Sequence, residues 1–238
     1  MSLPTVKWIS SQVLWQDSHC LVVNKPARLL TLGDDSGDDT LLALVREFHA
    51  SRQAPGKKGY VAPLHSLDRP VSGAVMFALS SKAASRLSAQ MRGRDIGKTY
   101  LAIVEGTPPG PSGVLTGALL KDRDRNVTTM VQAGTAGSKS CELAFRVIAR
   151  HGGLTLVAVA PKTGRSHQIR VQLADAGMPI YGDVKYGASV PWEGQIALHA
   201  RALAFHHPIT KELIEVVAAL PPVWQSIWPA PIAENIHV

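Results

Sequence analysis

The sequence predicts an α+β fold with a mixed, largely antiparallel sheet and flanking helices. Two pairs of strand-like segments are each joined by a short turn, as in antiparallel hairpins. These pairs are residues 141–150 with 154–160, and 198–205 with 212–218. The helices are predicted by two segments with apolar residues at helical spacing, 41–49 and about 81–92.

Two short strands are expected near the N-terminus, at residues 13–15 and 21–26, around a polar turn. The acidic loop 33–39 lacks the glutamate that closes an EF-hand loop, so we interpret it as a solvated loop. Thr40, or the last aspartate before it, is expected to cap the helix at 41–49. Its apolar face comprises Leu41, Leu44, Val45 and Phe48. Residues 50–59 form a basic linker.

Further elements follow in the middle of the chain. The apolar run 74–79 is typical of a buried strand, and Ser80 or Ser81 can cap the helix after it. Residues 98–106 alternate and then become apolar, which predicts another strand. The stretch 121–126 carries charges of both signs, and we interpret it as a solvated hairpin turn.

Composition narrows the class of protein. The 238 residues are 45% hydrophobic and 18% charged, which is typical of one large globular domain or two small ones. No membrane-spanning run or secretory signal is recognisable. With only Cys20 and Cys141, no disulfide framework is expected, and the reducing cytoplasm is the default location. The net charge of +7 favours a polyanionic partner, nucleic acid before membrane.

The stretch LHSLDRPVSG, residues 64–73, places an imidazole, a carboxylate and a guanidinium close together. Pro70 disfavours helix at Arg69, and Gly73 frees the backbone where the next strand begins. Asp68 is therefore expected on a short rigid turn at a strand end, where a carboxylate can meet a ligand. The ordinary alternative is that Asp68 caps a turn and pairs with Arg69.

A second group of donors lies in KTGRSHQIR, which ends at Arg170. A helix is expected from about Ser166 to Gly177, with Ile169 and Leu173 directed into the core. Arg170 would then lie beside the buried stripe, and a partly buried cation needs a carboxylate partner, for which Asp68 is the candidate. The amides at the helix start, with Lys162 and Arg165 nearby, could seat a phosphate. A structural salt bridge with ordinary caps is the alternative.

Several motifs are missing from the sequence. It contains no phosphate-binding loop, dinucleotide fingerprint or Gly-x-Ser-x-Gly elbow. The nine histidines and two cysteines show no zinc-ligand spacing. We therefore expect neither a cofactor nor a metal, and an enzyme here would work by acid–base or carboxylate chemistry alone.

From about residue 13 to 222, the chain resembles pseudouridine synthases of the RluA type. Each matching motif is modest alone, but the motifs occur in the family's order and with consistent spacing. They are VVNKP at 22–26, HSLDRPVSG at 65–73, KTYLA at 98–102, TGRSHQIR at 163–170, and Gly182-Asp183 followed by Tyr186-Gly187.

The resemblance implies isomerisation of an RNA uridine that is flipped into the site. The N1–C1′ bond would break, the uracil would rotate, and C5 would join the sugar. Asp68 would be the essential carboxylate, Tyr100 would stack on the uracil near the C5 proton, and Arg170 would hold Asp68 ionised. The reaction needs no cofactor or metal. The resemblance also suggests six RNA-binding residues: Lys25, His65, Arg69, Arg165, His167 and Lys185.

One position departs from the family pattern. The family usually has arginine directly after the motif's histidine, whereas this chain has Ser66. A relative that binds RNA without turnover is therefore one alternative, and a metal-free hydrolase using Asp68 and His65 is another. By resemblance we expect a single catalytic domain over 1–238, with two half-domains around a basic cleft and no separate N-terminal RNA-binding domain. Transfer RNA, ribosomal RNA or both are the expected partners of a monomer.

Overall fold

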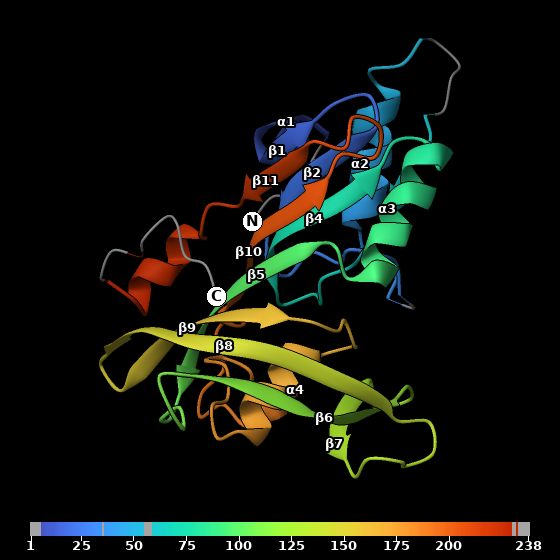
Figure 1. Ribbon diagram of the computed structural model, residues 1–238. Helices are drawn as coiled ribbons and strands as arrows, with labels where there is room; N and C mark the ends of the chain where they lie inside the picture. The colour runs from blue at the N-terminus through green and yellow to red at the C-terminus, as the bar shows by residue number, and fades with distance from the viewer. Residues whose placement is uncertain (1–5, 35, 55–58, 230–231, 233–238) are drawn as a thin grey trace. The chain divides into compact units, whose positions relative to one another are not determined.

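The computed structural model describes residues 6–34, 36–54, 59–229 and 232, and it divides into two compact units (Figure 1). The first unit comprises Met1–Gly97 and Ala200–Leu220, and the second comprises Lys98–His199 and Pro221–Val238. Each unit is therefore assembled from two separate stretches of the chain. The predicted linker at 50–59 lies partly outside the described residues.

The sheet of the first unit has the strand order β1-β2-β4-β10, with β3 beside β4 and β11 beside β10. The pairs β1–β2, β2–β4, β3–β4 and β10–β11 are antiparallel. The strands are β1 (Val13–Gln16), β2 (Cys20–Lys25), β3 (Ala62–Pro63), β4 (Ser72–Ala78), β10 (Leu198–His206) and β11 (Leu213–Val217). The predicted strands at the N-terminus and the last hairpin are thus confirmed.

Three helices accompany this sheet: α1 (Val6–Gln12), α2 (Leu41–Ala50) and α3 (Ser81–Gly93). The predicted caps are present, because Thr40 Oγ1 accepts the Ala43 N–H at 3.1 Å and Ser80 Oγ accepts the Ala83 N–H at 3.2 Å. The predicted apolar face of α2 is buried. Helix α1 was not predicted.

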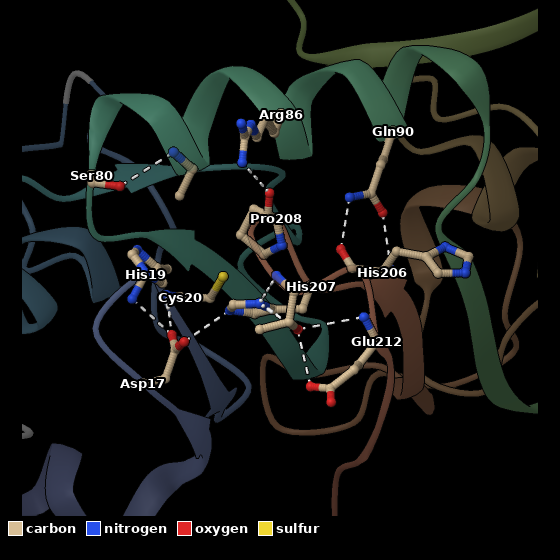
Figure 2. A network of polar contacts seen from close by, with 12 residues as sticks. Asp17, His19, Cys20, Ser80, Arg86, Gln90, His206, His207, Pro208 and Glu212 are labelled. Atoms are coloured by element: carbon tan, nitrogen blue, oxygen red, sulfur yellow. Dashed lines mark hydrogen bonds and ion pairs between the residues drawn. The ribbon is translucent and has the colours of Figure 1, made fainter.

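Helix α3 also holds the turn between β10 and β11. The Gln90 amide contacts both backbone groups of His206, donating to its carbonyl at 2.7 Å and accepting its N–H at 3.0 Å (Figure 2). Arg86 donates to the Pro208 carbonyl at 2.8 Å. The core beneath α3 includes Met76, Leu87 and Phe205, all fully buried.

The second unit is an antiparallel sheet in the order β5-β9-β8-β6-β7. The hairpin predicted around 151–153 and the turn at 121–126 are both confirmed. The strands are β5 (Gly97–Glu105), β6 (Ser112–Asp122), β7 (Val127–Val131), β8 (Lys139–His151) and β9 (Leu154–Pro161). The helices are α4 (Gln168–Asp175) and two short 3-10 helices, η1 (Val184–Tyr186) and η2 (Pro222–Ser226).

Helix α4, which contacts β6 and β7, begins two residues later than predicted. His167 adopts a left-handed conformation, φ 54°, and therefore cannot belong to the helix. Ile169 and Leu173 are buried as predicted, but so are the four other residues from Gln168 to Leu173. The helix is thus enclosed over its first six residues. In the part of the chain that the structure describes, no helix is long and apolar enough to span a membrane.

Candidate active site

Asp68 lies on a hydrogen-bonded turn of the first unit. The Val71 N–H donates to the Asp68 carbonyl at 3.0 Å, which closes the turn. The buried Thr31 hydroxyl donates to the Leu67 carbonyl at 2.7 Å and accepts the Leu67 N–H at 3.0 Å. Both backbone groups of the residue before Asp68 are therefore fixed, and the side chain of Asp68 remains half-buried.

Gly73 is the second residue of β4, the strand that follows this turn, and its conformation requires glycine. Its φ is +119°, and a Cβ would lie 2.4 Å from the Ala200 carbonyl oxygen on β10. The neighbouring strand could approach this closely only where the side chain is absent. The expectation that Gly73 shapes the start of β4 is thus met.

Lys25 lies at the end of β2 and is fully buried. Its Nζ donates to the carbonyls of Leu29 at 2.6 Å, Pro26 at 3.0 Å and Arg69 at 3.4 Å. Burial lowers the pKa of the Lys25 ammonium to about 7; Asp68 raises that pKa and Arg69 lowers it further. The sequence assigned Lys25 to an RNA contact. Because its ammonium is enclosed, we place it instead in the interior, beneath the turn that carries Asp68.

Arg69 forms an ion pair with Asp38. Its Nη2 lies 2.7 Å from Asp38 Oδ2, and both side chains are about half exposed, at 49% and 47%. Arg69 Nε also donates to the Arg28 carbonyl at 3.2 Å. In the segment before this turn, His65 Nε2 accepts the Met76 N–H at 3.2 Å, and Ser66 is exposed. The imidazole is thereby attached to β4.

Tyr100 belongs to the second unit, where it lies on β5 opposite Val159 of β9. Its side chain is partly buried. Lys98 is two residues earlier and therefore on the same face of the strand. Burial lowers the pKa of the Lys98 ammonium, and its Nζ lies 3.8 Å from the Cβ position at Gly164. The sequence assigned no role to Lys98, because a lysine at a strand start gives no sign of burial.

Arg170, also in the second unit, has a carboxylate partner that the sequence did not predict. Its Nε and Nη2 donate to the two carboxylate oxygens of Asp183 at 2.7 and 2.8 Å. The side chains are only 7% and 2% exposed. A countercharge for the buried guanidinium was expected, and Asp183 supplies one. The predicted pairing of Arg170 with Asp68 would join residues of different units and stays a prediction.

Gln168 organises the loop before α4. Its Oε1 accepts from the Thr163 hydroxyl at 2.8 Å and from the Arg165 N–H at 3.0 Å. Its Nε2 donates to the Glu142 carbonyl at 3.0 Å. The Gln168 N–H donates to the Arg165 carbonyl at 3.1 Å. Two amides at the predicted phosphate seat therefore have internal acceptors.

The remaining predicted RNA-binding residues differ in exposure. Arg165 is partly exposed, and its Nε donates to the Ser140 carbonyl at 3.0 Å. Lys185 is exposed, and its Nζ donates to the Asn126 carbonyl at 3.2 Å. His167 is buried, with Nδ1 2.6 Å from the Tyr186 hydroxyl. The side chains of Arg165 and Lys185 are therefore accessible to a ligand, whereas the side chain of His167 lies in the interior.

One group of possible metal ligands occurs in the first unit: Asp17, Cys20 and His207, with donor atoms within 4.8 Å of one another (Figure 2). His207 Nδ1 accepts the Thr210 N–H at 3.0 Å, so Nε2 carries the ring proton and faces Asp17 Oδ2 at 2.8 Å. Burial and Asp17 raise the pKa of the Cys20 thiol to about 12. In the structure these groups therefore form a hydrogen-bonded Asp17–His207 pair beside a protonated thiol.

Solved structures that share this fold include two human proteins. Human RNA Pseudouridylate Synthase Domain Containing 4 superposes with a TM-score of 0.76 at 22% identity, covering 92% of each chain. Human RNA Pseudouridylate Synthase Domain Containing 1 gives 0.72 at 24% identity, covering 95% of this chain and 89% of the other. The fold is therefore that of the pseudouridine synthases.

Sequence relatives identify the family. Residues 19–175 match the model for RNA pseudouridylate synthase. The uncharacterized RNA pseudouridine synthase YhcT of Bacillus subtilis is 35% identical over 211 residues, 88% of this chain and 68% of that protein. Ribosomal large subunit pseudouridine synthase C of Escherichia coli is 32% identical over 227 residues, 92% and 69% respectively. The chain belongs to the RNA pseudouridylate synthase family, which confirms the RluA-type resemblance and the enzyme class.

Proposed function

We propose that this protein isomerises specific uridines in RNA to pseudouridine, with Asp68 as the essential carboxylate. The observation that carries the proposal is the family match over residues 19–175, which includes the turn that bears Asp68. The hydrogen bonds of Thr31 and Val71 support it, because a reacting carboxylate must be held in a defined orientation. In this proposal, Asp68 assists cleavage of the N1–C1′ bond before the uracil rotates and rejoins through C5.

Tyr100 and Arg170 complete the proposed catalytic set. Tyr100 stacks on the flipped uracil, near the proton that leaves C5. Arg170 holds Asp68 ionised and aimed, since a nearby guanidinium favours the charged form of a carboxylate. The burial of Arg170 supports this role, because a guanidinium removed from water interacts more strongly with a carboxylate.

RNA is the proposed substrate, and large-subunit ribosomal RNA is the first candidate because of the relatives' names. Transfer RNA is the second candidate. The net charge of +7 favours either polyanion. Arg69, Arg165, Lys185 and His65 are the proposed RNA contacts, because none of these side chains is buried. We further propose that the enzyme acts as a monomer in the cytoplasm.

The test compares the wild type with Asp68→Asn, which removes the charge and keeps the shape. Ribosomal and transfer RNA carrying tritium at uridine C5 are incubated with each protein, and released tritium is measured. We expect the wild type to release tritium and the variant to lose at least about 10³-fold in rate, as when a catalytic nucleophile is removed. Tritium release by Asp68→Asn at the wild-type rate would exclude the carboxylate role.

RNA binding without turnover is the second candidate function, and the exposed Ser66 is the observation that favours it. A serine cannot supply the charge and reach of the arginine that the family usually has there. This alternative predicts equal RNA affinity for the wild type and Asp68→Asn, and no tritium release from either. A hydrolase would instead release free uracil, which chromatography of the same reactions detects.

A further inference from the structure

Arg170 is held on one edge by a carboxylate of its own unit. The bidentate contact with Asp183 uses the Nε–H and one Nη2–H of the guanidinium, two of its five donors. This geometry fixes the plane of the guanidinium and directs the Nη1 edge away from Asp183. Asp183 therefore helps to set the orientation of the Arg170 guanidinium.

The backbone around Asp183 is fixed by its own hydrogen bonds. The Asp183 N–H donates to the Ile180 carbonyl at 2.9 Å, and its carbonyl accepts the N–H groups of Tyr186 at 2.9 Å and Ala188 at 3.1 Å. Gly182, the preceding residue, has φ +87°, and a Cβ there would lie 2.7 Å from the Cβ of Trp192. The Gly-Asp pair thus forms a tight, packed turn that places the carboxylate in the interior.

Tyr186 supplies a second contact to Arg170. The guanidinium carbon lies 4.9 Å from the centre of the Tyr186 ring, within the range of a cation–π interaction. The hydroxyl of Tyr186 accepts the Thr128 N–H at 3.0 Å and lies 2.6 Å from His167 Nδ1. The ring is therefore anchored to β7 and to His167, the residue that precedes α4.

We propose that Asp183 and Tyr186 are positioning residues for the reaction: Asp183 fixes the guanidinium edge of Arg170 and Tyr186 supports its face. The inference rests on the catalytic role of Arg170 in the proposed function. A buried cation that loses one carboxylate partner loses part of its compensating charge, and it rearranges or takes up water. Displacing a catalytic group by about 1 Å can cost about 10²-fold in rate.

The kinetic test uses full-length Asp183→Asn with the RNA that the wild type modifies. We expect kcat to fall about 100-fold while KM for RNA changes less than about threefold, because Asp183 is buried and acts through Arg170. Glu142→Gln is the matched control. It removes the exposed Lys162–Glu142 ion pair of the same unit and should keep kcat within about twofold. Wild-type kcat in folded Asp183→Asn would overturn the proposal.

A second pair of variants tests Tyr186. Tyr186→Phe keeps the ring over Arg170, so we expect kcat within about threefold of the wild type, whereas Tyr186→Leu should lose about tenfold or more. Equal kcat values for the two variants would overturn the support of the Arg170 face by the ring. Both proteins are compared at a temperature below their melting points, so that unfolding does not determine the rates.

A thermal-melting cycle separates this inference from the proposed function. Tm is measured for Arg170→Met, Asp183→Asn and the double variant. Because the two side chains form one buried pair, we expect the second substitution to lower Tm much less than the same substitution does alone. Additive Tm losses would overturn the pairing. A wild type that modifies no RNA would overturn the proposed function and with it the positioning role, whereas the cycle tests the Arg170–Asp183 pairing without turnover.

Discussion

Lys25 is a buried ammonium group that donates to three backbone carbonyls, and its burial links stability to pH. Its pKa is about 7 in the folded protein and near 10.5 as the ordinary value. Between these values the unfolded chain binds a proton that the folded chain does not. By linkage, stability must then rise with pH through this window.

We predict that the free energy of unfolding contains a term that increases from about pH 7 to pH 10, by up to about 1.4 kcal/mol per pH unit. Lys25→Met removes the titrating group and should abolish this term. Urea unfolding at several pH values measures it, with the exposed Lys82→Met as a control that keeps the wild-type slope. An unchanged slope in Lys25→Met would refute the assignment.

Thr31 acts on the Asp68 turn through one hydroxyl, which both donates to and accepts from Leu67. We predict that Thr31→Val lowers the free energy of unfolding by about 1–3 kcal/mol, because two buried backbone groups lose their partner. It should also reduce kcat, since the residue before Asp68 is released. Thr31→Ser keeps the hydroxyl and should behave like the wild type in both urea unfolding and tritium release.

At the scale of elements, close strand packing determines how β4 begins. Gly73 must be glycine for two reasons, its positive φ and the approach of β10 at Ala200. The turn that carries Asp68 leads directly into this strand. Its geometry therefore depends on a contact between segments about 127 residues apart in sequence, which no local pattern reveals.

We predict that Gly73→Ala destabilises the protein by at least about 2 kcal/mol, since a Cβ would meet backbone atoms that cannot move aside. Gly33→Ala is the matched control, because nothing lies within 4 Å of a Cβ there. It should change the free energy of unfolding by less than about 0.5 kcal/mol. Similar melting temperatures for the two variants would contradict the steric argument.

At the scale of the whole molecule, the chain contributes two separate stretches to each compact unit. The proposed catalytic residues are divided between the units: Asp68 lies in the first, and Tyr100 and Arg170 lie in the second. The proposed function requires all three to act on one uridine. The net charge of +7 is a property of the whole chain and bears on RNA affinity.

We predict that RNA affinity falls linearly with the logarithm of salt concentration, as expected for phosphate contacts. Arg165→Ala should weaken binding and reduce the magnitude of this slope by about one, because one contact is lost. Arg92→Ala, at the end of α3, serves as a control, since we interpret that side chain as compensating the helix dipole. An unchanged slope in Arg165→Ala would remove this residue from the proposed interface.

The sequence alone determined the features that depend on neighbouring residues. The hairpin at 151–153 and the caps Thr40 and Ser80 follow from strand periodicity and short-range hydrogen bonds, and the structure confirms them. The family could also be recognised from the sequence, because the order and spacing of its motifs can be read without knowledge of the fold. Helix α1 and the delayed start of α4 were missed, since weak periodicity and one left-handed residue leave no clear pattern.

Only the tertiary structure decided which polar groups are buried and what they contact. Asp183 proved to be one of the partners of Arg170, and the ammonium of Lys25 proved to be enclosed by carbonyls. Asp17 and His207 meet across 190 residues of sequence. A side chain's charge is visible in the sequence, but its burial and its countercharge depend on segments that only folding brings together, and these set its pKa and its role.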